Sequence, residues 1–336
     1  MVLVKEIRFP DVGAVEVGEV NDHRRPGPGE ALVAPSYVGI CGSDLHVYAG
    51  RHPFVRPPVV TGHESVGDVV AVGDGVAGIA RGDRVLINPL VHCGQCVACA
   101  AGSLNTCESA RVLGFKLPGT ARTRTVQHAS RLHRVPHEVA TDVACLAEPL
   151  ATAVHAVGRP HGSSAMENVL VIGGGCIGLA VLLAARAHGA GSVTLVEPVA
   201  AKRALASRLG ADRVVEPEHL DELSGFTTAF DCVAGADTLR AAVDGTRGGG
   251  HVVVVGVPSG TELTLPLPRM QRFEVDLVGS GMYLPTDIDR ALSLIADGTI
   301  DPGPLISRRF PLADAPAAYP AAADPDTVKV LVQLFD

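Results

Sequence analysis

The chain has 336 residues, of which 47% are hydrophobic and 19% are charged. This balance supplies enough apolar side chains for buried cores, argues against a disordered chain, and at this length predicts two domains. A net charge of -8 argues against nucleic acid as a partner, because a DNA-binding surface concentrates positive charge. Residues 1–6 do not begin a basic segment followed by a long apolar run, so we expect no signal peptide and a cytoplasmic protein.

The first 136 residues alternate short apolar segments with turns rich in glycine and proline. Residues 30–34 and 65–72 are typical strands, and residues 26–29 and 73–75 are typical turns. Short strands separated by such turns predict a small β-barrel.

The pattern changes near Asp142, where apolar strands begin to alternate with alanine-rich helices. Strands are predicted at residues 168–172, 192–197, 229–233, 251–256 and 274–279, and helices at 178–188 and 200–209. This alternation predicts an α/β domain with a doubly wound parallel sheet. The tail is rich in proline, contains a last strand at 327–334, and is expected to fold back onto the first domain. We therefore predict one domain over 1–148, completed by 300–336, and a nucleotide-binding domain over 149–299.

A glycine-rich turn follows the strand at 168–172. Gly173, Gly175 and Gly178, with Cys176 and Ile177 between them, form the G-x-G-x-x-G pattern between a strand and a helix. The turn lets backbone N–H groups and the helix N-terminus approach a pyrophosphate. A purely structural turn is the alternative. Residues 168–185 are also uncharged and long enough to raise the question of a membrane span, which the glycines make the weaker interpretation.

Glu197 ends the next predicted strand, nineteen residues beyond Gly178. A carboxylate at this position accepts hydrogen bonds from the adenosine ribose and repels a 2′-phosphate, so it favours NAD over NADP. Lys202 and Arg203 follow closely and are able to tolerate a phosphate, so NADP remains an alternative.

Four cysteines lie within fifteen positions: Cys93, Cys96, Cys99 and Cys107. Four thiolates close a tetrahedral zinc shell without an open position, which is typical of a structural site. Disulfides or an iron–sulfur cluster are the alternatives, but a reduced compartment disfavours disulfides, and nothing else in the chain suggests electron transfer.

Three further segments, at residues 39–46, 62–64 and 147–150, occur in the order and at the separations found in the medium-chain zinc dehydrogenases. With the cysteine cluster and the glycine turn, the resemblance covers nearly the whole chain. The Cys-Gly-Ser-Asp and Glu-Pro-Leu forms resemble the polyol (sorbitol) and threonine dehydrogenase branch; liver-type alcohol dehydrogenases place a cysteine where Glu148 stands. The resemblance implies a GroES-like β-barrel catalytic domain and a Rossmann nucleotide-binding domain.

The resemblance also implies a catalytic zinc site. Cys41, His63 and Glu64 correspond to its ligands, and Glu148 is either a ligand or a partner of the zinc-bound water. Such a mixed set of ligands leaves one position open for substrate. Asp44 would orient His63 through the second ring nitrogen.

Four more residues receive roles from the resemblance. Ser43 would accept the substrate proton and pass it outwards, and His46 would be the next group in this proton relay. Thr152 would face the nicotinamide, and Gly256 is a further candidate for cofactor contact.

The implied activity is transfer of a hydride between an alcohol and NAD, with two zinc ions per chain and a homodimer or homotetramer as the assembly. The expected partner is a small alcohol or ketone, neither nucleic acid nor membrane. The substrate stays open among a polyol, a sugar or cyclitol, an amino alcohol and the aminocyclitol alcohols of antibiotic pathways. A zinc-free reductase of the same superfamily and a non-catalytic nucleotide-binding protein are the alternatives from other classes; the intact set of ligands argues against both.

One segment departs from the family. After residues 114–119 the family usually has an acidic residue and an aromatic, whereas Arg122 and Arg124 stand in the segment 120–124 here. We hypothesise that this charge affects substrate choice or a subunit contact, with a solvated loop as the alternative. Residues 48–54 are a further candidate for the wall of the substrate pocket.

Overall fold

The protein is described by a computed structural model covering residues 3–258 and 262–335, which form two compact units. Unit 1 contains the described residues up to Glu148, Leu284–Gly298 and the residues from Gly303 onwards, and unit 2 contains Pro149–Tyr283 and Thr299–Pro302. The predicted boundary after residue 148 therefore agrees with the division of the chain. The predicted nucleotide-binding domain over 149–299 differs from it, because residues 284–298 belong to unit 1.

Unit 1 is built mainly of short strands with a few helices. Its strands are β1 (Leu3–Phe9), β2 (Glu16–Asn21), β3 (Glu30–Ile40), β4 (Val59–Val60), β5 (Glu64–Val72), β6 (Arg84–Ile87), β7 (Leu90–Val91), β8 (Arg111–Val112), β9 (Thr125–His128), β10 (Leu132–Arg134), β17 (Ile306–Pro311) and β18 (Lys329–Gln333). Its helices are α1 (Gly42–Tyr48), α2 (Val97–Ala100), α3 (Thr141–Ala144), α9 (Pro285–Ala296) and α10 (Ala315–Ala322).

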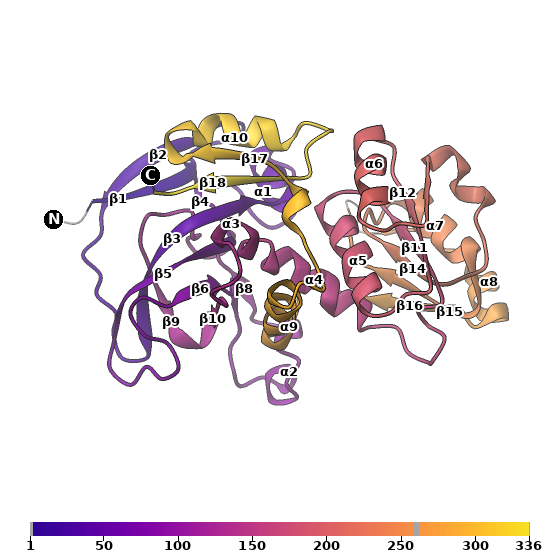
Figure 1. Cartoon of the computed structure of the whole chain (residues 1–336), viewed down its shortest axis with the longest axis horizontal. Coiled ribbons are helices and arrows are strands. Elements are labelled where there is room, and N and C mark those ends of the chain that lie inside the picture. Colours follow the sequence, from indigo (N-terminus) through magenta and orange to yellow (C-terminus); the bar gives the residue numbers. More distant parts are fainter. Residues whose placement is uncertain (1–2, 259–261, 336) are drawn as a thin grey trace. The chain divides into compact units, whose positions relative to one another are not determined.

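The largest sheet of unit 1 has the strand order β10-β6-β5-β3-β18-β17, with β9 also paired to β3. β18 runs antiparallel to β3, so the tail of the chain adds to the sheet of the first domain, as expected (Figure 1). A smaller sheet, β2-β1-β4, packs its apolar side against α1 and α10 around Phe9 and Tyr319, whose rings lie 4.9 Å apart.

Strand β3 is longer than the sequence predicts, because it continues past Pro35 to Ile40. Its register with β5 shifts between Pro35 and Tyr37, and a proline is tolerated in a strand where the hydrogen-bond ladder is interrupted. The strands approach closely here: a Cβ on Gly67 would lie 2.2 Å from the carbonyl oxygen of Ala34. The extension carries the chain directly to Cys41.

Helix α9 accounts for the difference from the predicted domain division. It buries Ile288, Ala291 and Leu292 on one face. Asp289 also accepts a 2.6 Å hydrogen bond from Nδ1 of the buried His133 on β10, so this helix is tied to unit 1.

Unit 2 is an α/β unit with one six-stranded sheet. Its strands are β11 (Asn168–Ile172), β12 (Ser192–Val196), β13 (Arg213–Val215), β14 (Phe226–Asp231), β15 (Thr246–Val254) and β16 (Asp276–Gly279), and its helices are α5 (Cys176–Ala187), α6 (Ala200–Arg208), α7 (Ala236–Gly245) and α8 (Leu267–Phe273). Helix α4 (Ala147–Val157) starts at the end of unit 1 and continues into unit 2.

All pairings in this sheet are parallel, and the strand order is β13-β12-β11-β14-β15-β16. Numbered within the unit this is 3-2-1-4-5-6, the order of the Rossmann fold, with helices on both faces (Figure 1). The predicted GroES-like barrel with a Rossmann domain is confirmed.

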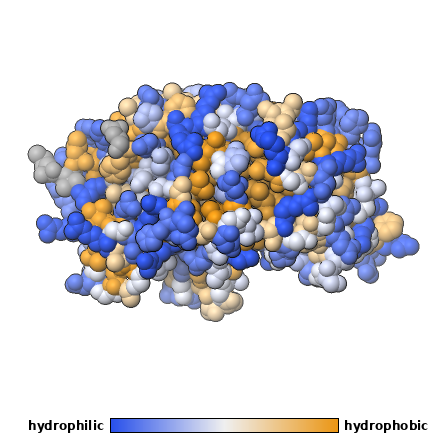
Figure 2. Space-filling model, in the orientation of Figure 1, coloured by the Kyte–Doolittle hydropathy of each residue, from blue (hydrophilic) through white to orange (hydrophobic). Residues whose placement is uncertain are grey.

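The uncharged stretch at 168–185 is divided between β11 and α5, which are the buried strand and first helix of this sheet. No helix among the described residues is long and apolar enough to cross a membrane. Hydrophilic side chains cover much of the face in Figure 2.

Candidate functional site

The side chains of Cys41, His63 and Glu64 meet in unit 1. One ligand atom from each lies within 4.8 Å of the other two, and His63 and Glu64 are buried. Cys41 is the N-cap of α1 at the end of β3, and His63 directly precedes β5. Glu64 opens β5 opposite Gly39 in the register of the two strands. Antiparallel pairing of β3 with β5 thus brings together residues more than twenty positions apart.

Asp44 supports this group from α1. Its carboxylate accepts hydrogen bonds from the Cys41 backbone N–H at 3.0 Å and the Thr61 hydroxyl at 2.9 Å. Oδ1 also lies 3.5 Å from Nδ1 of His63, which leaves Nε2 as that ring's candidate ligand atom.

Burial and neighbouring charges shift the pKa values of Asp44 and His63 in opposite directions. Burial raises the pKa of Asp44, but the neighbouring His63 and the two hydrogen bonds bring it below its usual value. Burial lowers the pKa of His63, but the Asp44 carboxylate and Cys41 raise it well above its usual value. A metal ion binding this ring therefore has to displace a proton, as is general for imidazole ligands.

Glu64 has a partner that was not among the predicted site residues. Lys329 on β18 donates from Nζ to both carboxylate oxygens, at 2.7 and 2.6 Å, and to the carbonyl oxygen of Ile40 at 3.1 Å. The side chains of Lys329 and Glu64 are 2% and 1% exposed. Gly39 leaves room for the Glu64 carboxylate, because a Cβ on Gly39 would lie 2.1 Å from Oε2 of Glu64.

A signal for Lys329 was present in the sequence. It is one of only four lysines in the chain, and it begins a strand whose next three residues are apolar. A charged residue in such a strand indicates a buried partner.

Glu148, at the start of α4, is buried but does not belong to the three-residue ligand group. The buried thiol of Cys145, three residues before Glu148, donates to the backbone carbonyl of Glu64 at 3.1 Å. Burial, with further effects from Glu64 and Glu148, raises the pKa of Cys145 well above its usual value.

Ser43 and His46 lie on α1 next to the ligand group. Ser43 is half-buried and His46 is exposed, and residues three apart are neighbours on a helix surface. The ring of Phe115 lies 5.0 Å from that of His63 and 4.9 Å from that of His52. The segment 48–54, predicted to line the pocket, therefore reaches the neighbourhood of His63 through His52.

The four clustered cysteines also meet in unit 1. Sγ of Cys93 lies 4.0 Å from that of Cys99 and 3.6 Å from that of Cys107, and the ligand atoms of all four lie within 4.8 Å of one another. Zinc–sulfur bonds of about 2.3 Å in a tetrahedron separate the sulfurs by about 3.8 Å. All eight cysteines are thiols, so the geometry fits a zinc ion and disfavours disulfides. Backbone hydrogen bonds from Gln95 and Cys96 lower the pKa of Cys93 to about 6.

The glycine turn connects β11 to α5 in unit 2. Gly173 has a φ of 98°, which favours glycine. A Cβ on Gly178 would lie 1.7 Å from the Gly173 carbonyl oxygen, so the helix requires glycine to pack this closely. Gly175, the N-cap of α5, faces open space, and Cys176 and Ile177 form the first turn of that helix, half-buried.

Glu197 lies beside this turn, directly after β12. It is buried, and its two carboxylate oxygens accept the backbone N–H groups of Gly174 at 2.7 Å and Val199 at 2.9 Å. The guanidinium group of Arg203 is held by other partners than the Glu197 carboxylate. It donates to the carbonyl oxygens of Glu197 and Pro198 and pairs with Glu216.

Three further candidates for cofactor contact are placed in unit 2. Lys202 is half-buried on α6, and Thr152 is half-buried on α4. Gly256 follows β15, and a Cβ there would lie 2.8 Å from the Cys232 carbonyl carbon.

Arg122 does not belong to a solvated loop. It is 8% exposed, and its guanidinium group lies 3.0 Å from Glu6 on β1 and 3.4 Å from Asp22 after β2. Arg122 therefore ties its segment to the edge of the small sheet, which is a structural role within the chain.

Replacing Arg122 by glutamate is expected to lower the free energy of unfolding of unit 1 by about 3–5 kcal/mol, because it leaves the buried Glu6 without its cation, whereas Asp22 keeps Arg24. Arg124→Glu, at a half-buried neighbouring position, is the matched control and should cost less than about 1 kcal/mol. Urea unfolding measures both. Equal losses in the two variants would contradict the pairing, and a changed substrate preference in the folded Arg122 variant would restore the substrate-choice hypothesis.

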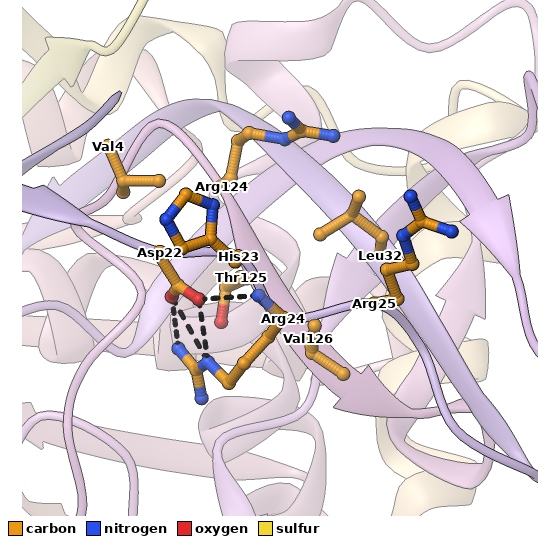
Figure 3. A pocket seen from close by; sticks show the side chains of 9 residues that line it. All are labelled: Val4, Asp22, His23, Arg24, Arg25, Leu32, Arg124, Thr125 and Val126. Atoms are coloured by element: carbon orange, nitrogen blue, oxygen red, sulfur yellow. Dashed lines mark hydrogen bonds and ion pairs between the residues drawn. The ribbon is translucent and has the colours of Figure 1, made fainter. Parts of the chain in front are cut away.

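A small cavity of about 250 Å³ is lined by Val4, Asp22, His23, Arg24, Arg25, Leu32, Arg124, Thr125 and Val126. Figure 3 shows the carboxylate of Asp22 against the guanidinium group of Arg24, and a side-chain hydrogen bond from Arg24 lowers the pKa of Asp22 to about 2. None of the candidate zinc ligands lines this cavity.

Comparison with known proteins agrees with this geometry. The alcohol dehydrogenase GroES-like domain matches residues 27–137, and the zinc-binding dehydrogenase domain matches residues 176–297. The chain is 34% identical to L-idonate 5-dehydrogenase of Vitis vinifera over 92% of its own length and 89% of that protein's. It belongs to the zinc-binding dehydrogenase family.

Two further members support this assignment. Sorbitol dehydrogenase of Arabidopsis thaliana is 34% identical, over 84% of this chain and 82% of its own. The structure of a zinc-binding dehydrogenase from Sinorhizobium meliloti 1021 bound to NADP superposes with a TM-score of 0.91 at 32% identity, covering 99% of this chain and all of that one. The resemblance to the polyol branch of the zinc-binding dehydrogenases is thereby confirmed.

Proposed function

We propose that this zinc-binding dehydrogenase oxidises a secondary alcohol of a polyol or sugar acid to the ketone with NAD, or catalyses the reverse reaction. The observation that carries the proposal is the meeting of Cys41, His63 and Glu64, supported by Asp44 and Lys329. Relatives named for L-idonate and sorbitol give the substrate class.

The donor set of this group suits a catalytic zinc ion. A thiolate, an imidazole and a carboxylate are all zinc ligands, and three protein ligands leave an open position. The ion supplies Lewis-acid chemistry that lowers the pKa of the substrate hydroxyl. Glu64 can pair with Lys329 and still face the ion, because a carboxylate has about four lone-pair sites. Since Glu148 lies outside the group, we propose that it acts through a water molecule rather than as a direct ligand.

Ser43 and His46 provide the route for the proton. Ser43, half-buried beside Cys41, takes the hydroxyl proton, and the exposed His46 passes it to solvent. Phe115 and His52 form one wall beside His63 and exclude water from the reacting carbon.

Unit 2 binds NAD in this proposal. Gly173, Gly175 and Gly178 would admit the pyrophosphate at the N-terminus of α5, and bound NAD would supply the hydride acceptor. Glu197 faces the adenosine ribose, and Arg203 is held by backbone carbonyls and Glu216 instead of facing a 2′-phosphate. Lys202, Thr152 and Gly256 complete the proposed cofactor contacts.

Replacing Glu197 by serine is expected to shift the ratio of kcat/KM for NADP over NAD upwards by about 10- to 100-fold, the equivalent of one charged hydrogen bond. The ratio is the readout because Glu197 also holds the turn, so both cofactors lose some affinity. Glu218→Gln, an exposed acid of the same unit, is the control for charge alone. An unchanged ratio in the serine variant would contradict the proposed ribose contact.

The four-cysteine cluster holds a second, structural zinc ion in this proposal. A homodimer or homotetramer and a cytoplasmic location remain predictions. An aminocyclitol alcohol stays an alternative substrate class, because its ring presents the same secondary hydroxyl groups.

The proposal is tested by following NADH formation across a panel of polyols, sugar acids, cyclitols, amino alcohols and simple alcohols. Turnover is expected for the polyols or sugar acids and should be lost in the Cys41→Ser variant. Turnover restricted to aminocyclitols would replace the substrate class but keep the mechanism. Turnover that survives in the Cys41→Ser variant would overturn the zinc mechanism.

A further inference from the structure

A third cluster of metal-ligating side chains lies in unit 2, apart from the glycine turn. It consists of His161, His251 and Asp276, whose ligand atoms lie within 4.8 Å of one another. His251 on β15 and Asp276 on β16 are opposite one another in the register of these parallel strands. His161 comes from the segment between α4 and β11. The fold therefore holds two ligands side by side on a sheet and brings the third from a loop.

The two distances to Asp276 fit ligands around one ion better than hydrogen bonds. Oδ2 of Asp276 lies 3.6 Å from Nε2 of His251 and 3.6 Å from Nε2 of His161, longer than a hydrogen bond between such groups. Nε2 of His251 is also within hydrogen-bond distance of His161, at 3.3 Å from Nδ1 and 3.5 Å from the backbone nitrogen, so the ion proposed below would take the place of these hydrogen bonds. Bonds of about 2.0–2.1 Å to zinc in a tetrahedron separate neighbouring ligand atoms by about 3.4 Å.

Burial and access also suit an ion. The side chain of His251 is 5% exposed and is fixed by the sheet, whereas those of His161 and Asp276 are 76% and 54% exposed. An ion can thus enter from solvent and keep a water in the fourth position. Arg159 holds the same loop against β16 by donating to the Gly279 carbonyl oxygen at 3.2 Å.

We propose that His161, His251 and Asp276 bind a divalent transition-metal ion of the zinc class, in addition to the two zinc ions of the proposed function. Two imidazoles and a carboxylate are the ligands such ions prefer over calcium or magnesium. Asp276 begins β16, and the glycine turn follows the carboxyl end of β11, so the cluster lies toward the amino ends of the strands. The ion ties the loop at His161 to the sheet and takes no part in hydride transfer.

The experiment measures zinc bound per chain after equilibration of the full-length protein at micromolar free zinc. The test variant, His161→Ala/Asp276→Asn, changes only the two exposed ligands. The control variant, His219→Ala/Glu222→Gln, removes an exposed histidine–carboxylate pair of the same unit whose atoms lie 3.2 Å apart. The test variant is expected to bind one zinc ion fewer than wild type, and the control variant the same number as wild type.

Two outcomes would overturn the site: equal zinc in wild type and the test variant, or an equal loss in both variants. NAD affinity is measured alongside, and it should be unchanged in the test variant, which shows that unit 2 is folded. The experiment compares the number of zinc ions bound by the variant with the number bound by wild type. Zinc ions at Cys41 or at the four-cysteine cluster contribute equally to both numbers, so they do not affect the difference.

Discussion

Replacing Lys329 by methionine is expected to lower the free energy of unfolding of unit 1 by about 3–5 kcal/mol. The substitution keeps the apolar stem and removes the cation that both Glu64 oxygens contact at 2.7 and 2.6 Å. A carboxylate that is 1% exposed is then left in a buried site without its partner. Urea unfolding followed by circular dichroism measures the loss.

A double variant distinguishes the loss of the Lys329–Glu64 ion pair from the loss of side-chain packing. Lys329→Met/Glu64→Gln removes both charges, so it should recover most of the stability that the single variant loses. Equal stability of the single and double variants would show that Glu64 is not left unpaired when Lys329 is removed. Activity should stay low in the double variant, because Glu64 faces the proposed zinc ion.

Cys41→Ser is expected to reduce kcat/KM by about a thousandfold, corresponding to about 4 kcal/mol of lost Lewis-acid stabilisation. It should also remove one zinc ion per chain, because serine is a poor ligand in place of a thiolate. Metal analysis and NADH formation by the same preparation measure both effects.

Cys93→Ser is the matched control for this prediction. It removes a thiolate from the four-cysteine cluster, so it should release the other zinc ion and lower the melting temperature. The folded fraction should retain near-normal kcat/KM, since this cluster has no open position for substrate. A thousandfold loss in both variants would contradict the separation into a catalytic and a structural site.

Local patterns were enough to predict much of the fold. The strand at 168–172 and the turn from Gly173 to Gly178 were located because the signal lies within a few consecutive residues. The four cysteines likewise lie on one short loop, so their meeting follows from chain connectivity. In contrast, the strand predicted at 30–34 is only part of β3, which continues through a register shift to Ile40.

Residues that meet over long separations were harder to predict. Lys329 lies 265 positions from Glu64, and Arg122 lies 100 positions from Asp22. These pairs depend on how strands are ordered in a sheet, which no short pattern specifies. The grouping of helix α9 with unit 1 was not predicted for the same reason, because its partner His133 lies 156 positions from Asp289. Cys41 and His63 were found through the resemblance to the dehydrogenase family, and not through their spacing alone.

The position of β18 has a consequence for how the protein is made. This strand is the last in the described chain, yet it pairs with β3 and supplies the cation for Glu64. During translation, unit 2 is available to fold once residue 302 has emerged from the ribosome. Unit 1 cannot complete its main sheet until residue 333 has also emerged, although most of its strands precede unit 2 in the chain. We therefore expect the usual amino-to-carboxyl order of domain folding to be reversed here, with the proposed zinc ligands on an incomplete sheet until β18 has emerged.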